Sequence, residues 1–132
     1  MMKRSLILVL SLLTLAFCLP AFAESADWNY DANYAILRGY DGAGGDVVVP
    51  AEIDGFTVDV IGVGVFKGDT ITSLTLPETV LELRSNAVAS CEKLANITLP
   101  QSLVVINRMN FFSCGALTEI TIPAGVRYIG DT

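Results

Sequence analysis

Cys91 and Cys114 carry the most versatile chemistry in this 132-residue sequence, because thiols can form a disulfide, bind a metal or act as a nucleophile. The sequence contains no histidine, so it lacks the commonest general base and the commonest transition-metal ligand. It also contains no phosphate-binding loop, no dinucleotide-binding fingerprint and no paired carboxylate spacing. We therefore expect no enzymatic activity, no catalytic residue, no metal and no cofactor.

Oxygen-bearing side chains alternate along the stretch DWNYDANYAILR, at Asp27, Asn29, Asp31 and Asn33. This alternation is a weak calcium-loop signal. A calcium-binding EF-hand loop would need glycine at its sixth position and glutamate at its twelfth. The sequence has Ala32 and Arg38 there, so a polar leader segment is the favoured interpretation and calcium the alternative.

The first 23 residues have the layout of a secretory signal peptide. Lys3 and Arg4 precede a largely apolar run over residues 6–19, and the small residues before the predicted cleavage site are Ala21 and Ala23. The run is shorter than the roughly 18 residues that a membrane-spanning helix needs. We expect cleavage after Ala23, a secreted or cell-surface location and no membrane insertion afterwards; a lipid anchor at Cys18 is the weaker alternative.

The acidic balance excludes two classes of partner. The formal net charge is −6, and loss of the predicted signal peptide with Lys3 and Arg4 leaves six basic residues against 14 acidic ones, a net charge of −8. Such a surface disfavours nucleic acid, whose phosphates need neutralising, and anionic membranes.

A length of this order predicts one domain.

Prolines mark an internal repeat. They lie 27, 23 and 23 residues apart, at Pro50, Pro77, Pro100 and Pro123. Each follows a β-prone stretch, over residues 47–49, 74–76, 97–99 and 120–122. In each stretch the outer apolar residues would face a core and the middle residue would face outward. Proline would then end the hydrogen-bonded ladder, because it has no N–H to donate.

Apolar residues recur in register with the prolines. One such column consists of Ile61, Leu83, Ile106 and Ile129. A single coil of 23 residues cannot bury its own apolar side chains, whereas stacked coils join each column into a continuous core. The sequence therefore predicts a β-rich leucine-rich-repeat solenoid of three to four coils, with short parallel strands stacked at a 23-residue period over residues 47–132.

Cys91 and Cys114 fall in one such column, one coil apart. Coils stack about 4.8 Å apart with parallel side chains, whereas a disulfide needs converging Cβ atoms about 3.8 Å apart. We therefore favour a structural column of buried thiols. A disulfide and a reactive or metal-binding role remain alternatives.

Residues 24–46 would form an N-terminal cap. The β-prone runs 34–37 and 47–49 flank a glycine-rich loop, which indicates a hairpin that covers the open end of the first coil. The longer first interval holds five inserted residues around Asp54-Gly55, a turn signal that predicts a small surface excursion. Four aromatic residues would pack the cap or, alternatively, form a glycan platform: Trp28, Tyr30, Tyr34 and Tyr40.

The stretch "LPQSLVVINRMNFFSCGALTEITIP" (Leu99–Pro123) resembles the repeat of the BspA-like leucine-rich repeat family, which reads roughly I-P-x-x-V-x-x-I-G-x-x-A-F-x-x-C-x-x-L-x-x-I-x-I-P. The stretch Gly44–Phe66 resembles the usual first repeat of that family, and the resemblance covers about residues 34–130. It implies a secreted or surface protein of bacterial type that acts in adhesion and binds host matrix proteins or other cells. The family has no catalytic residues to transfer.

Three columns depart from the family pattern: the aromatic column has Val88, the cysteine column has Asp69 in the first coil, and the glycine column varies. The glycine after the isoleucine is present as Gly62 and Gly130, but Arg84 and Asn107 stand there in between. If this column requires positive φ, arginine would tolerate it poorly. This reasoning predicts a central coil looser than its neighbours.

The candidate binding residues are the outward-facing ones of the predicted strands: Ser73, Thr75, Asn96, Thr98, Glu119 and Thr121. Rigid repeat faces suit recognition of a protein or glycan partner, although threonine is also a good exposed strand residue in its own right. The first hypothesis is thus an exported, adhesin-type binding module. The alternative is a structural spacer or fragment of a larger surface protein whose functional domain lies beyond Thr132.

The sequence ends within a coil, two residues after Gly130. We therefore expect the last coil to be incomplete and to continue beyond the chain. An open last coil would expose its apolar column and invite self-association with another copy.

Overall fold

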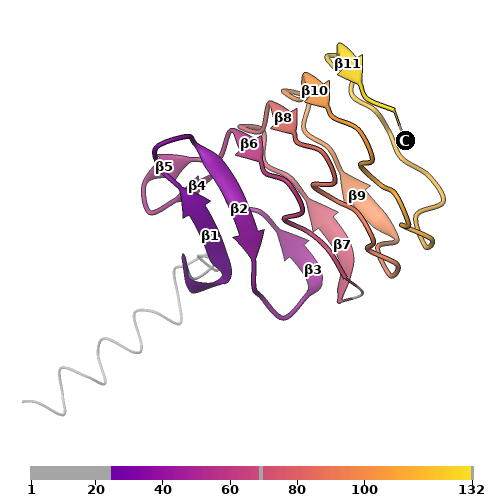
Figure 1. Cartoon of the computed structure of the whole chain (residues 1–132), viewed down its shortest axis with the longest axis horizontal. Helices are drawn as coiled ribbons and strands as arrows, with labels where there is room; N and C mark the ends of the chain where they lie inside the picture. Colours follow the sequence, from indigo (N-terminus) through magenta and orange to yellow (C-terminus); the bar gives the residue numbers. More distant parts are fainter. Residues whose placement is uncertain (1–24, 69, 132) are drawn as a thin grey trace, which may run out of the picture.

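The computed structural model describes residues 25–68 and 70–131, and in them the predicted solenoid of stacked coils is confirmed (Figure 1). Apart from a short 3-10 helix η1 (Ser25–Asp27), the regular elements in these ranges are β-strands. The signal peptide predicted for residues 1–23 lies outside the described residues, and so does Asp69. None of the described helices is long and apolar enough to cross a membrane.

Six strands form a sheet that runs the length of the solenoid (Figure 1). Their order is β1 (Trp28–Asp31), β2 (Ile36–Tyr40), β6 (Val60–Ile61), β8 (Glu82–Leu83), β10 (Val105–Ile106) and β11 (Tyr128–Ile129). From β2 onward all pairs are parallel, and each coil adds one short strand. The register aligns one inward residue per strand: Leu37, Ile61, Leu83, Ile106 and Ile129.

A second, three-stranded parallel sheet lies beside it and contains β3 (Gly45–Val48), β7 (Ile71–Thr75) and β9 (Asn96–Thr98). These strands overlap three of the four predicted β-prone stretches. The prediction for residues 120–122 was wrong, because that segment forms no strand. It belongs to the last described coil, which has a neighbour on one side only, and β9 is consequently an edge strand of this sheet.

The core lies between the sheets and includes residues of the predicted apolar columns, together with others such as Ile53, Val58 and Val65. The side chains of the central coil are the most completely buried. Those with no exposed surface are Val80, Leu83, Ala87, Val88, Cys91 and Leu94. The expectation of a looser central coil is therefore wrong.

The reason is that the variable glycine column does not have positive φ. The left-handed positions lie two residues later, at Gly64, Asn86 and Met109. At Gly62 itself the constraint is space rather than φ, since a Cβ there would lie 2.6 Å from the carbonyl oxygen of Leu37. Arg84 therefore occupies this column with an ordinary backbone conformation.

The N-terminal cap is a hairpin, as expected, but its strands differ from the predicted ones. β1 pairs antiparallel with β2, with a bulge between Asn29 and Tyr30. The predicted partners, residues 34–37 and 47–49, lie in different sheets. These two segments form no hairpin with each other, because β2 and β3 each pair in parallel with a strand of the next coil instead.

A second hairpin, β4 (Glu52–Ile53) with β5 (Phe56–Thr57), forms the predicted surface excursion. Its two-residue turn consists of Asp54 and Gly55, with φ angles of 52° and 82°. Positive φ at both central residues matches the twist of the strands, which explains the Asp-Gly sequence.

Trp28 closes the first coil from the cap. Its ring centroid lies 4.7 Å from that of Tyr40 and 6.4 Å from that of Phe66 in the core. The packing interpretation is thus confirmed for Trp28 and Tyr40. Tyr34, by contrast, is 68% exposed under the guanidinium of Arg38.

Candidate functional site

Two rows of outward-facing side chains run across β7 and β9. The register pairs Ser73 with Asn96 and Thr75 with Thr98. Leu74 lies between the two β7 residues and is buried, so strand alternation turns its neighbours outward. The structure therefore brings four of the six predicted binding residues together on one surface, which we call the strand face.

β3 extends both rows with residues that sequence reasoning did not include. Asp46 pairs in register with Ser73, and Val48 pairs with Thr75. The Ser73 hydroxyl donates to Asp46 Oδ1 at 2.7 Å, and the Thr72 hydroxyl donates to the same oxygen at 3.3 Å. Asp46 thus places a carboxylate at one end of the row. The proline alignment had already placed residues 47–49 beside β7, so the signal that could have found Val48 was present, whereas Asp46 had been assigned to the predicted cap segment.

The remaining two predicted residues are placed differently. Glu119 and Thr121 are exposed, but they lie in a segment without strand structure. They lie one repeat after the corresponding residues of β9, but their segment is not part of the three-stranded sheet.

The strand face offers hydrogen-bonding groups from both of its rows. Its hydroxyl, amide and carboxylate groups can donate and accept hydrogen bonds, and the predicted residues and their β3 neighbours include no basic side chain. Backbone hydrogen bonds between coils hold the groups at a fixed spacing of about 4.8 Å. Within the described ranges, no three His, Cys, Asp or Glu side chains are grouped to hold a metal ion. Asp31 of the weak calcium signal is paired with Arg38 at 2.7 Å, and the hydrogen bond from Arg38 lowers the pKa of Asp31.

Cys91 and Cys114 are free, buried thiols in one column. The Cys91 thiol points at the carbonyl oxygen of Phe66, 3.5 Å away in the preceding coil, and the Cys114 thiol points at that of Val88 at 3.8 Å. Burial, and secondly the proximity of Cys114, raises the pKa of Cys91 to about 11. Burial also raises the pKa of Cys114. The thiolate form that nucleophiles and metal ligands need is therefore disfavoured.

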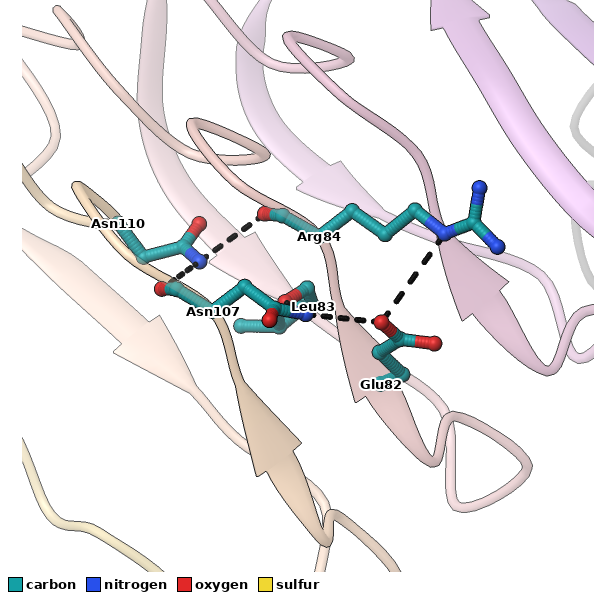
Figure 2. Close-up of polar contacts among 5 residues, drawn as sticks. All are labelled: Glu82, Leu83, Arg84, Asn107 and Asn110. Carbon is teal, nitrogen blue, oxygen red and sulfur yellow. Dashed lines mark hydrogen bonds and ion pairs between the residues drawn. The ribbon is translucent and has the colours of Figure 1, made fainter. Parts of the chain in front are cut away.

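A polar network joins β8 and the residue after it to the segment that follows β10 (Figure 2). Asn107 Nδ2 donates to Glu82 Oε1 at 2.8 Å and to the carbonyl of Leu83 at 3.1 Å. Asn110 Nδ2 donates to the carbonyls of Arg84 and Asn107, at 3.0 and 2.7 Å. The network is structural, because it satisfies backbone groups.

Comparisons with known proteins agree with this architecture. The model of the BspA-type leucine-rich repeat region matches residues 52–132 in six copies, which is more than half of the chain. No curated protein matches the sequence.

Two solved structures are similar. A leucine-rich repeat protein of T. pallidum superposes with a TM-score of 0.72 at 31% identity, over 78% of this chain and 50% of its own. A leucine-rich repeat protein of Bacteroides capillosus superposes with a TM-score of 0.66 at 33% identity, over 76% of this chain and 80% of its own. The chain thus spans about half the length of the first relative and most of the second.

Proposed function

Because the chain belongs to the BspA-type leucine-rich repeat family, we propose that it is an exported binding module of the adhesin type that recognises a protein or glycan partner. Proteins of this family are repeat proteins that generally bind other proteins, and they are typically secreted or at the cell surface. Export of this chain rests on the signal peptide predicted for residues 1–23. We propose no enzymatic role, because the two structural relatives are repeat proteins rather than known enzymes.

The observation that carries the proposal is the in-register pairing of Ser73 with Asn96 and of Thr75 with Thr98. Short polar side chains in register leave a low, even surface with little side-chain entropy to lose when a partner binds. The stacked coils are rigid, so this surface is organised before binding. Residues Glu119 and Thr121 extend it toward the last coil as part of the same proposed face.

The test is a binding screen of the exported chain against a panel of host matrix proteins and a glycan array. Replacing Thr75, Thr98 and Thr121 together by lysine should abolish the binding found, because three long cationic side chains would cover the face. The matched control places three lysines at exposed turn positions instead, at Asn33, Gln101 and Ala124. Both variants change the net charge equally. Equal binding by the two variants would contradict the strand face as the site.

The alternative is a structural spacer whose functional domain lies beyond Thr132. A specific observation favours keeping it: the chain spans only half of the T. pallidum relative. If the chain is a spacer, it should bind nothing in the screen by itself. A longer natural protein that contains it should then bind with or without the three threonines. This outcome separates the two functions.

A further inference from the structure

Two aromatic rings meet at the capped end of the solenoid, where β1 lies near the hairpin of β4 and β5 (Figure 1). The rings of Tyr30 in β1 and Phe56 in β5 are stacked, with centroids 6.3 Å apart and planes inclined by 26°. The Tyr30 hydroxyl donates a hydrogen bond to the carbonyl of Thr57 at 2.5 Å, which holds its ring against the hairpin. Phe56 is 50% exposed, so an aromatic ring is fixed at the surface.

Asp59 adds a carboxylate beside these rings. It lies two residues after Thr57, whose carbonyl the Tyr30 hydroxyl reaches, and Val58 between them is fully buried in the core. Burial raises the pKa of Tyr30, and nearby negative charges raise it further, that of Asp59 more than that of Asp31. Both observations place the Asp59 carboxylate near the Tyr30 hydroxyl.

The cap already contains a ring and a carboxylate that share an arginine. The Arg38 guanidinium lies over the Tyr34 ring, 6.0 Å from its centroid, and is paired with the Asp31 carboxylate at 2.7 Å. Arg38 Nε also donates to Asp31 Oδ2 at 2.8 Å. A planar guanidinium can lie on a ring face and hydrogen-bond a carboxylate at the same time. The three groups therefore satisfy one another within the chain.

Tyr30, Phe56 and Asp59, which we call the cap patch, have the rings and the carboxylate without the arginine. Among the arginines of the described residues, none lies over either ring and none is paired with Asp59. The patch offers hydrogen-bond acceptors, because the Tyr30 hydroxyl gives its proton to Thr57 and keeps its oxygen free to accept. The net charge of −6 adds attraction for a cation.

We propose that the cap patch binds an arginine side chain of a protein partner, with the guanidinium on the Phe56 ring and its N–H groups on the Asp59 carboxylate. A guanidinium is planar and weakly hydrated, so it stacks on one exposed ring more readily than the compact, strongly hydrated ammonium of lysine. A quaternary ammonium has no N–H to offer these acceptors and is bound by cages of several rings. The cap patch shares no residue with the strand face, so the proposal does not depend on the ligand of that face.

A titration of the exported chain with N-acetylarginine amide, followed by nuclear magnetic resonance, tests the proposal. We expect the amide signals of Phe56, Thr57 and Asp59 to shift and to saturate at millimolar probe, as one exposed cation–ring contact with a charged hydrogen bond should give. N-acetylcitrulline amide has nearly the same shape without the charge and should cause no saturable shift. N-acetyllysine amide should bind more weakly than the arginine probe.

Two variants of the cap patch should weaken binding of the arginine probe about fivefold or more: Asp59→Asn, which removes the charge, and Phe56→Leu, which removes the ring. Asp54→Asn is the charge control, since it makes the same charge change at the neighbouring turn, where asparagine tolerates the positive φ. Tyr34→Leu is the aromatic control, because Arg38 already covers that ring. Both controls should bind the probe like the wild type.

Circular dichroism of each variant checks that the solenoid is folded, and Asp59→Asn keeps the test decisive if Phe56→Leu disturbs the hairpin. Equal shifts with the citrulline probe overturn the proposal, and so does a lysine probe that binds as tightly as the arginine probe. An equal loss in Asp54→Asn and Asp59→Asn overturns it as well, because the probe would then respond only to the overall charge.

Discussion

Asn110 occupies a column that holds Val65 and Ala87 in the two preceding coils. It is buried, and among the described residues it is the only polar one that is. Its side chain donates to two carbonyls and accepts from the N–H of Val88 at 3.2 Å. A buried amide can replace an apolar residue here because it pairs the N–H of Val88 and the carbonyl of Asn107. Its bond to the carbonyl of Arg84 is a second one, since that oxygen also accepts from the N–H of Ala87 at 3.0 Å.

Asn110→Ala should therefore lower the free energy of unfolding by about 2 kcal/mol or more, because each buried backbone group left unpaired costs about 1–3 kcal/mol. Urea denaturation followed by circular dichroism measures the change. Asn33→Ala, at an exposed turn, is the control and should stay within about 0.5 kcal/mol of the wild type. A loss for Asn110→Ala as small as that of the control would show that water replaces the lost partners.

The thiols give a pH prediction. Since the pKa of Cys91 is raised to about 11 in the folded chain, the folded state holds this proton more tightly than the unfolded state. The stabilisation is complete below about pH 9 and should be lost as the pH rises to about 11. Unfolding measured across this range should show a smaller decline for Cys91→Ala than for the wild type. Identical declines would mean that other groups, such as Tyr30, whose pKa is also raised, account for the effect.

Among the secondary-structure elements, strands of the repeated coils were predicted from the sequence, whereas the strand pairing at the two ends of the solenoid was not. Three β-prone stretches became β3, β7 and β9, because each has a coil neighbour with which to pair. Residues 120–122 have the same apolar pattern but form no strand, because the sequence pattern of a segment does not tell whether a neighbouring strand is there to pair with it. The strands β8 and β10 escaped notice because two residues leave no periodicity to detect, although their inward residues were recognised as a column.

The glycine columns show the same limit. The sequence shows that the column of Gly62 holds arginine and asparagine in other coils. It does not show whether glycine is required there by lack of space for a side chain or by a positive φ angle. The structure separates the two requirements: space at Gly62, and positive φ at Gly64, with nothing within 4 Å of an added Cβ.

This difference leads to opposite predictions for two neighbouring substitutions. Gly62→Ala should push β2 away from β6 and loosen the cap, because the new Cβ would meet the Leu37 carbonyl at 2.6 Å. Gly64→Asn should be tolerated, since Asn86 adopts φ of 56° in the same column. The fluorescence of Trp28, the only tryptophan, reports the cap during urea titration. A lower midpoint for Gly64→Asn than for Gly62→Ala would contradict this assignment.

For the whole molecule, stability should depend on position along the solenoid, because each coil contacts only its neighbours. Leu83 has a coil on both sides, whereas Ile129 has one. Leu83→Ala should cost about 2–5 kcal/mol of unfolding free energy. Ile129→Ala should cost well under half of that. Comparable losses at the two sites would mean that the last coil is as firmly packed as the centre.

The hairpin at the first coil also gives assembly of the chain a direction. Between described strands, no pair joins residues more than 27 positions apart. A chain that emerges from a ribosome or an export channel begins with its N-terminus, so the cap is complete before the first coil appears. Each later coil can then pair with a coil that has already folded, and no described strand has to wait for a partner far along the sequence. Folding can keep pace with synthesis or export, one coil at a time.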